Sequence, residues 1–509
     1  MNVFPNSLFH VQNGDLNVNG TLDVQTGATM RLFYGSLVDL DGDFTLNGYV
    51  HLDGGGNFYV HGGFQEAATS HINIQSGSFI CDKPYFTTRA IQYLYGTLTM
   101  SGGTFEITNN HLSLPATFQD FITGGMIRVG GSFIALDNVF QPSGTNTVEL
   151  INFSGTGSPY VDLHTGNWFI NLTVSGNTSW MIGGSGASTI TVKQDLTINS
   201  GSLSGGTGDA IYLGDDWVNN AGNSGFIPGT SIVYLTAQNL APDRQVISGT
   251  TTFYDLTNQN NTTLIEFAGP VTVSNNYNGS AGGTEGETFI TGSPVNINKL
   301  VLPSGAFSLS TSAPAVNVTS LDQGGAVSVT NGTLNIDDIV ETELQGSYTI
   351  YNGLIDITQD AVSFLDINAD IHIAGGELRL TGGTDVSYWP VSGSHVFTMS
   401  GGIMDYKTLG IYLQNNNMTY NITGGVIRTA GPFYSLPGVT AFDPVNNEVE
   451  LYGTVNSNVN VGTGSWFHDL TINKTGAQVN ATRAFPVKGE LNAQSGTFNT
   501  NNYLITVGP

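Results

Sequence analysis

Short runs of alternating apolar and polar residues recur along the whole chain. Residues 16–24 show the pattern clearly, with apolar residues at every second position on both sides of Asn19-Gly20. The same arrangement returns at 327–336 and at 371–380. A period of two places successive side chains on opposite faces of a strand, so that one face of each run is buried. Stretches with helical periodicity and helix caps are absent from the sequence, which therefore predicts an all-β chain.

Two all-β architectures fit these runs. Asn-Gly between alternating runs is a strong hairpin signal, and a hairpin-rich sandwich array is one alternative. The runs are very short, however, and they recur at roughly 20 to 25 residues per turn of the pattern, which favours stacked coils. We therefore predict a parallel β-solenoid, a single elongated rod on the order of 100 Å long if each coil adds about 4.8 Å.

A long internal repeat supports stacking. Residues 72–203 recur element by element at 371–498: Ile-Thr-Gly-Gly-Met-Ile-Arg at 122–128, for example, returns as Ile-Thr-Gly-Gly-Val-Ile-Arg at 422–428. No Pro-rich, Ser-rich or charge-dense linker interrupts the sequence. The expected organisation is one continuous β-solenoid over residues 1–509.

A second motif closes larger blocks of the sequence. Segments 168–173, 253–257 and 466–471 each contain an aromatic residue, then Asn or Asp, and then Leu-Thr. We expect the aromatic ring to fill the coil interior, and the Asn or Asp side chain to bind backbone groups of the turn. A carbohydrate-stacking platform is the functional alternative.

Composition narrows the classes of partner. The chain has 67 Gly and 39% hydrophobic residues, and 39 Asp and Glu against 13 Lys and Arg give a net charge of −26. Nucleic acid is excluded as an expected partner because phosphate binding needs clustered Lys and Arg. No stretch of 18 apolar residues predicts a membrane span. The single cysteine, Cys81, excludes an intramolecular disulfide and is expected to be a small core residue.

The first residues have neither a basic region nor an apolar region, so they do not form a signal peptide. The second copy of the long repeat is shorter than the first, and neither end has an atypical capping segment. We expect the chain to be an excerpt or mature part of a longer protein with flanking domains, or a unit that stacks end to end.

The repeated blocks resemble a known group of proteins. Val192-Lys193-Gln194-Asp195-Leu196 and Val487-Lys488-Gly489-Glu490-Leu491, together with the aromatic motif, are similar to the Gly/Asn/Thr-rich repeat regions of large bacterial cell-surface proteins, many exported by the type IX route. The resemblance implies a right-handed parallel β-helix, secretion, display at the cell surface, and an adhesive or structural role with glycans or cell surfaces as partners.

The densest acidic cluster is a candidate calcium site. Asp39, Asp41 and Asp43 alternate with Leu40 and Gly42, so that Leu40 is expected to point inward and the three carboxylates outward. Carboxylate oxygens are the ligands that Ca²⁺ prefers, although the downstream bidentate Glu of an EF-hand is missing. A solvated strand face is the alternative, and no other cofactor is expected.

Other charged groups show weaker patterns. Two smaller acidic groups are Asp215-Asp216 and Asp337-Asp338 with Glu341 and Glu343. Three histidines are evenly spaced, His51, His61 and His71, but they form no zinc motif. Three charged positions are duplicated between the repeats. Because a single active site needs no second copy, we interpret these as structural pairs holding coil faces: Lys193 with Asp195, Lys488 with Glu490, and Arg128 matched by Arg428.

The sequence therefore favours a non-enzymatic extracellular β-solenoid segment of structural or adhesive function. A polysaccharide-active β-helix enzyme, a lyase or a glycoside hydrolase, is the second hypothesis, and it requires carboxylates converging on one groove. A filament subunit joined end to end is the third.

Overall fold

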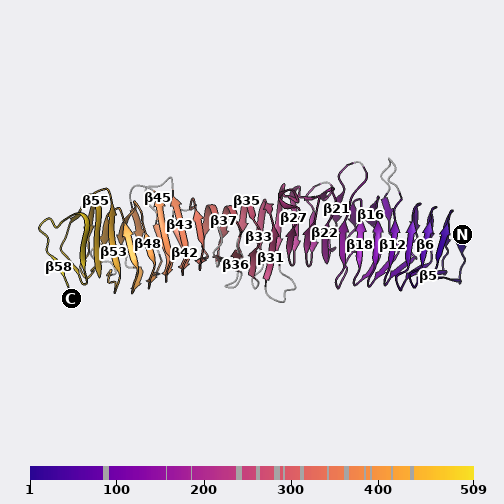
Figure 1. The fold of residues 1–509 in the computed structure, drawn as a ribbon, viewed down its shortest axis with the longest axis horizontal. Helices are drawn as coiled ribbons and strands as arrows, with labels where there is room; N and C mark the ends of the chain where they lie inside the picture. The colour runs from indigo at the N-terminus through magenta and orange to yellow at the C-terminus, as the bar shows by residue number, and fades with distance from the viewer. Residues whose placement is uncertain are drawn as a thin grey trace. The chain divides into compact units, whose positions relative to one another are not determined.

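The computed structural model shows an all-β chain made of parallel strands (Figure 1). The structure describes residues 1–83, 91–155, 157–184, 186–236, 244–259, 264–279, 287–290, 293–309, 315–340, 343–359, 366–382, 386–389, 393–413, 417–435 and 441–508. Within these residues the one helix is a short 3-10 turn, η1 (Gly222–Ser224). The chain has two compact units, Met1–Leu256 and Thr257–Pro509. The expectation of one continuous solenoid over residues 1–509 stays a prediction.

Unit 1 is a β-solenoid in which each coil contributes one strand to each of several ladders. The longest ladder contains, in order, β3 (Asp15–Val18), β6 (Leu37–Leu40), β9 (Asn57–Val60), β12 (Ser78–Cys81), β15 (Thr104–Ile107), β18 (Met126–Val129), β20 (Thr147–Leu150), β22 (Asn171–Val174), β25 (Leu196–Ile198), β28 (Trp217–Asn219) and β31 (Arg244–Gly249).

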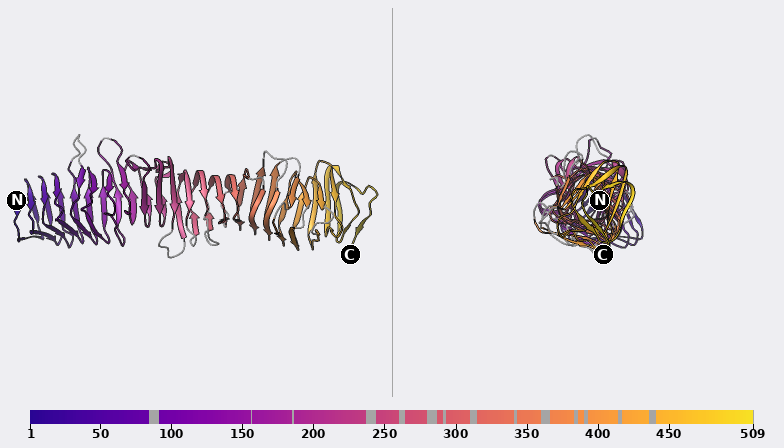
Figure 2. Two further views of the ribbon diagram at one scale, coloured as in Figure 1. Left: turned by 180° about the vertical axis from the view of Figure 1, so that it is seen from behind. Right: turned by 90° about the vertical axis from the view of Figure 1, so that its left-hand side faces the viewer.

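Four further ladders form the other walls of unit 1 (Figure 2). The first is β1 (Asn2–Val3), β4 (Leu22–Val24), β7 (Phe44–Leu46) and β10 (Phe64–Glu66). The second is β2 (Leu8–Gln12), β5 (Thr29–Phe33), β8 (Tyr49–Leu52), β11 (His71–Ile74), β14 (Thr97–Met100) and β17 (Gln119–Ile122). The third is β13 (Ile91–Tyr93), β16 (His111–Leu114), β19 (Phe133–Ala135), β21 (Tyr160–Leu163), β23 (Ser179–Ile182), β26 (Ser202–Ser204) and β29 (Phe226–Ile227). The fourth includes β24 (Thr189–Val192), β27 (Thr207–Leu213) and β30 (Thr230–Leu235), followed by β32 (Thr251–Phe253) and β33 (Asp255–Asn258).

Unit 2 is also a β-solenoid of parallel ladders. One ladder contains β34 (Leu264–Phe267), β36 (Glu287–Ile290), β38 (Ala306–Leu309), β40 (Ala326–Val329), β42 (Glu343–Ile350), β44 (Asp366–Ile373), β47 (His395–Met399) and β50 (Met418–Ile422). A second contains β35 (Val271–Asn278), β37 (Val295–Leu302), β39 (Val316–Gln323), β41 (Thr333–Ile336), β43 (Leu354–Gln359), β45 (Glu377–Gly382), β48 (Ile403–Asp405), β51 (Val426–Thr429), β53 (Glu448–Gly453), β55 (Asp469–Ala481) and β57 (Leu491–Asn499). The remaining strands are β46 (Val386–Trp389), β49 (Gly410–Leu413), β52 (Phe433–Ser435) and β54 (Ser457–Asn460), and the pair β56 (Phe485–Val487) and β58 (Ile505–Val507).

The hairpin alternative is wrong at the positions that suggested it. On either side of Asn19-Gly20, β3 pairs in parallel with β6, and β4 pairs in parallel with β1 and β7. The Asn-Gly pair therefore turns a solenoid corner rather than a hairpin. Hydrogen-bonded residues on successive coils are 20 positions apart in Gly63 with Asp43 and 30 positions apart in Val246 with Asp216.

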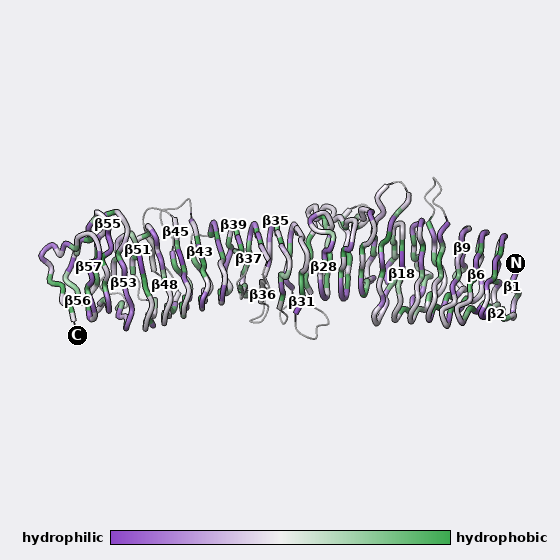
Figure 3. Tube along the Cα trace, in the orientation of Figure 1, coloured by the Kyte–Doolittle hydropathy of each residue, from purple (hydrophilic) through white to green (hydrophobic). Residues whose placement is uncertain are grey.

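Hydrophobic and hydrophilic residues alternate along the chain in both units (Figure 3), and most of the buried residues are apolar. In β6, for example, Val38 and Leu40 are fully buried whereas Leu37 and Asp39 are partly exposed. Cys81 is 3% exposed, which confirms its expected place in the core. Among the residues described, no helix has the length and apolar character needed to cross a membrane.

The two repeated segments carry the same aromatic packing. In unit 1, Phe133, Phe140 and Phe169 form a buried triad with ring centroids 5.1 to 5.9 Å apart. In unit 2, Phe433, Phe442 and Phe467 form a buried triad with centroids 5.1 to 6.2 Å apart. Edge-to-face aromatic contacts of this kind add to the free energy gained by burial. The repeat in the sequence thus corresponds to a repeat in the core of each unit.

Candidate functional site

Charged residues stack in register on the outer face of unit 1. Arg128 on β18 lies between Glu106 on β15 and Glu149 on β20, which are its register partners. Its Nη1 donates to Glu106 Oε2 at 2.6 Å, and its Nε donates to Glu149 Oε2 at 2.7 Å. A cation between two carboxylates neutralises charge that neighbouring coils would otherwise hold against each other. This arrangement supports a structural role for Arg128.

The corresponding residue of unit 2, Arg428, belongs to a longer stack. Five register partners alternate in charge from β43 to β53: Asp356, Arg379, Asp405, Arg428 and Glu450. Arg379 Nη1 lies 2.9 Å from Asp356 Oδ2, and Arg428 Nη2 lies 2.9 Å from Asp405 Oδ2. The stack continues an asparagine ladder on the preceding coils, in which Asn335 donates to Asn317 and Asn317 to Asn296. Most neighbours in this column of the wall therefore make polar side-chain contacts with each other.

The duplicated lysines lie over the duplicated tryptophans. Lys193 Nζ is 5.2 Å from the ring centroid of Trp168, and Lys488 Nζ is 3.5 Å from that of Trp466. Each indole also donates its Nε1 proton to a backbone carbonyl of the preceding coil, at Pro142 in unit 1 and at Pro444 in unit 2. These tryptophans are half-buried, whereas the next residue in each motif, Phe169 or Phe467, fills the interior.

In two of the three segments, the Asn or Asp of the aromatic motif binds the backbone of the following coil, as expected. Asn171 Oδ1 accepts a hydrogen bond from the Asp195 amide at 3.2 Å, and Asp469 Oδ1 accepts one from the Glu490 amide at 2.7 Å. In unit 1 the same kind of hydrogen bond recurs on the next coils. Asp195 Oδ1 accepts one from the Asp216 amide at 3.2 Å, and Asp216 Oδ1 accepts one from the Val246 amide at 2.7 Å. A column of side-chain oxygens thus caps one corner of successive coils.

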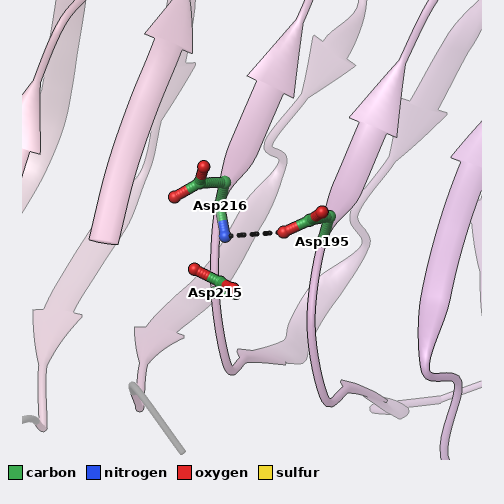
Figure 4. Close-up of side chains that lie close together, drawn as sticks. All are labelled: Asp195, Asp215 and Asp216. Atoms are coloured by element: carbon green, nitrogen blue, oxygen red, sulfur yellow. Dashed lines mark hydrogen bonds between the residues drawn. The ribbon is translucent and has the colours of Figure 1, made fainter. Parts of the chain in front are cut away.

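This column brings three carboxylates together in unit 1 (Figure 4). Asp195, Asp215 and Asp216 each offer an oxygen, and these oxygens lie within 4.8 Å of one another. Burial, followed by the negative charges of Asp216 and Asp195, raises the pKa of Asp215 to about 6. Burial also raises the pKa of Asp216, although the hydrogen bond from the Val246 amide opposes the change.

The arrangement has two chemical capacities. Three carboxylate oxygens at this spacing are suited to Ca²⁺, and a carboxyl with a raised pKa beside an ionised one is the pairing that glycoside hydrolysis uses. Arg244 also acts on this group, since its charge lowers the pKa of Asp216. The sequence showed Asp215-Asp216 and Asp195 as separate features, and only the register of the coils joins them.

The predicted calcium residues lie at one corner of unit 1. Asp39 is on β6, and Asp41 and Asp43 lie in the turn that follows it, with Leu40 fully buried as expected. Asp39 Oδ1 is 2.8 Å from His61 Nε2, and Asp43 Oδ1 accepts a hydrogen bond from the Gly63 amide. Two of the three carboxylates therefore have partners on the next coil. Calcium binding at Asp39, Asp41 and Asp43 stays a prediction.

The three evenly spaced histidines do not form one stack. His51 on β8 and His71 on β11 belong to one wall, where the register pairs His71 with Tyr49. His61 belongs to another wall and bridges two carboxylates, with Nδ1 2.7 Å from Asp82 Oδ1. Although burial lowers the pKa of His61, its hydrogen bonds to Asp82 and Asp39 raise it overall.

The other acidic group noted in the sequence, Asp337-Asp338 with Glu341 and Glu343, belongs to unit 2 and is spread along the chain. Asp337 and Asp338 are exposed, whereas Glu343 on β42 accepts a hydrogen bond from Asn368 at 3.1 Å. Glu341 lies outside the described residues. This group brings no catalytic pair together among the residues described.

Comparison with known proteins found no matching family model, no similar curated protein and no similar solved structure.

Proposed function

We propose that this chain is a non-enzymatic structural or adhesive β-solenoid segment of a bacterial surface protein that acts outside the cell. The observation that carries the proposal is the duplication of paired polar contacts. Arg128 and Arg428 occupy charge stacks, and Lys193 and Lys488 lie over tryptophans, at matching places in the two repeats. Contacts made twice serve coil stacking, which every coil needs, rather than a reaction, which needs one site.

The composition of the outer faces supports display in water. Outward positions carry Asn, Thr, Ser and acidic residues, and the net charge of −26 opposes self-association. Such surfaces offer many hydroxyl, amide and carboxylate groups to glycans or cell surfaces. Extracellular localisation is part of this proposal and rests on the resemblance of the repeated blocks.

Retention on immobilised polysaccharides tests the adhesive part. The purified chain is run through native gels that contain xylan, alginate or polygalacturonate, with bovine serum albumin as the control protein. Slower migration in at least one polysaccharide gel supports adhesion to glycans. Unchanged migration in all three would leave only the structural part of the proposal standing.

A polysaccharide-active enzyme is the second candidate, favoured by Asp195, Asp215 and Asp216. Asp215, with a pKa of about 6, would act as the acid, and Asp195 or Asp216 as the ionised partner. Against this, Asp195 and Asp216 each cap a backbone amide of the next coil, a task that Asn171 performs one coil earlier. Release of reducing ends, measured with Asp215→Asn as the control variant, separates the two candidates.

A further inference from the structure

One wall of unit 1 is interrupted, and a pocket lies at the interruption. The ladder of β1, β4, β7 and β10 ends at β10, and β13 on the following coil begins a separate ladder with β16. A cavity of about 410 Å³ lies here, lined among others by Glu66, Lys83, Gln92, Tyr93, Tyr95 and Asn110.

Glu66 occupies an inward position that is apolar on the preceding coils. Its register partner is Leu46, which in turn pairs with Val24. The side chain is buried, with 9% of the residue exposed. Oε1 accepts hydrogen bonds from the Ser70 hydroxyl at 2.7 Å and from the Gly96 amide at 3.0 Å. Oε2 is buried and has no hydrogen-bond partner among the described residues.

A second residue that lines the pocket, Asn110, also has a buried oxygen without a partner among the described residues. Asn110 is 6% exposed, and its Oδ1 accepts no hydrogen bond from the part of the chain that the structure describes. A buried polar atom without a partner destabilises the folded chain. Two residues that line one cavity each carry such an atom, which points to a ligand that brings hydrogen-bonding groups to them.

The charge state of the pocket selects the chemistry of that ligand. Burial raises the pKa of Glu66 to about 7, so both the acid and the carboxylate exist at neutral pH. A hydroxyl group suits both forms because it donates as well as accepts, whereas an ammonium group only donates. Lys83 at the same pocket opposes a cationic ligand, and Glu66 opposes an anionic one.

The rim of the pocket offers apolar surface. The rings of Tyr93 and Tyr95 stack with centroids 5.6 Å apart and planes inclined by 23°, and these residues are 40% and 38% exposed. Exposed rings beside a few buried polar groups are typical of small-molecule sites. Buried polar residues and exposed aromatic rings at one pocket match a molecule with hydroxyls on its edge and C–H groups on its face.

We propose that this pocket binds a neutral saccharide, whose hydroxyls meet Glu66 Oε2 and Asn110 Oδ1 while its C–H face packs on Tyr93. The terminal torsions of Glu and Asn are broad, so a bound hydroxyl draws these oxygens to the cavity surface. This proposal gives a ligand class for the adhesive role proposed above. It rests on that role for its biological use but not for the binding itself.

Saturation-transfer NMR on the full chain tests this site, with lactose, maltose, cellobiose and N,N′-diacetylchitobiose as probes in millimolar excess. We expect at least one disaccharide to receive saturation at its ring C–H protons. Tyr93→Ala, a change at an exposed residue that leaves the core intact, and Glu66→Gln should each weaken binding about tenfold. Tyr34→Ala is the matched control, because Tyr34 is 63% exposed and does not line the pocket.

Three results would overturn the site: no transfer to any of the four disaccharides, transfer that persists in both pocket variants, or displacement of the sugar by tetramethylammonium. Asp215→Asn should leave binding unchanged, since that residue lies outside the pocket. Sugar binding in Asp215→Asn, together with reducing-end release by the unmodified chain, would refute the non-enzymatic proposal and leave the pocket intact.

Discussion

Lys488 Nζ lies 3.5 Å from the ring centroid of Trp466, and Lys193 lies over Trp168 in the same way at 5.2 Å. Cation–π attraction strengthens as the ammonium approaches the ring face. We predict a coupling free energy of about 0.5 to 1 kcal/mol between Lys488 and Trp466, and less between Lys193 and Trp168. Double-mutant cycles with Lys→Met and Trp→Leu, followed by circular dichroism in urea, measure both. A larger coupling between Lys193 and Trp168 than between Lys488 and Trp466 would contradict the geometry.

The charge stacks differ in how deeply their carboxylates lie. Asp405 has a fully buried side chain, whereas the side chains of Glu106 and Glu149 are 10% and 17% exposed. Arg428→Met should lower the free energy of unfolding by about 1 to 3 kcal/mol, because Asp405 then keeps only Lys407 and Tyr452 as partners. Arg128→Met is the matched change in unit 1 and should cost less. Equal losses in urea unfolding would show that burial of the carboxylate does not set the cost.

The titration of Glu66 makes the free energy of unfolding depend on pH. Burial raises its pKa from 4.5 to about 7 in the folded chain. The folded state therefore binds more protons than the unfolded state between these values, so stability is fully present below pH 4.5 and falls as pH rises to 7. The fall amounts to about 3 kcal/mol.

Comparison with Glu66→Gln isolates this contribution. Burial lowers the pKa values of His51 and His71, and these residues act in the opposite direction as pH falls through 6.5. The difference in unfolding free energy between the parent chain and Glu66→Gln should change by about 3 kcal/mol from pH 4.5 to 7. A difference that is constant with pH would show that the pKa of Glu66 is not raised in the folded chain.

The three carboxylates at one corner of unit 1 repel one another. Asp215→Asn removes one charge while Asp195 and Asp216 keep their backbone hydrogen bonds. In buffer containing EDTA at pH 7.5, this variant should be more stable than the parent chain, by less than about 1 kcal/mol because the group is partly exposed. Thermal unfolding measures the change. A lower melting temperature in EDTA would mean that Asp215 makes a favourable contact that the structure does not show.

The sequence predicts the walls of the coils well because alternation is a local property. Val38 and Leu40, for example, follow from the period of two alone. The choice between hairpin and coil at Asn19-Gly20 is harder, because both turns use the same residues and differ only in the partner strand. The long repeat and the short interval at which the strand runs recur favour coils over hairpins. The parallel ladders confirm a solenoid.

The candidate sites depend on register, which the sequence does not specify at the residue level. Asp195 meets Asp216 because their coil is 21 residues long, whereas the next coil takes 30 residues from Asp216 to Val246. His61 meets Asp39 and Asp82 for the same reason. Glu66 could have been identified as buried, since it follows the inward Phe64 by two positions, but its unpartnered oxygen depends on where the ladder ends.

The most direct test of the account is polysaccharide turnover by the purified chain. Xylan, alginate and polygalacturonate are incubated with the parent chain and with Asp215→Asn, and reducing ends and absorbance of unsaturated uronides are followed over days with and without Ca²⁺. The account predicts no product above the level of the variant under any condition. Product formed by the parent chain and lost in Asp215→Asn would contradict it and would identify Asp195, Asp215 and Asp216 as the centre of an enzyme.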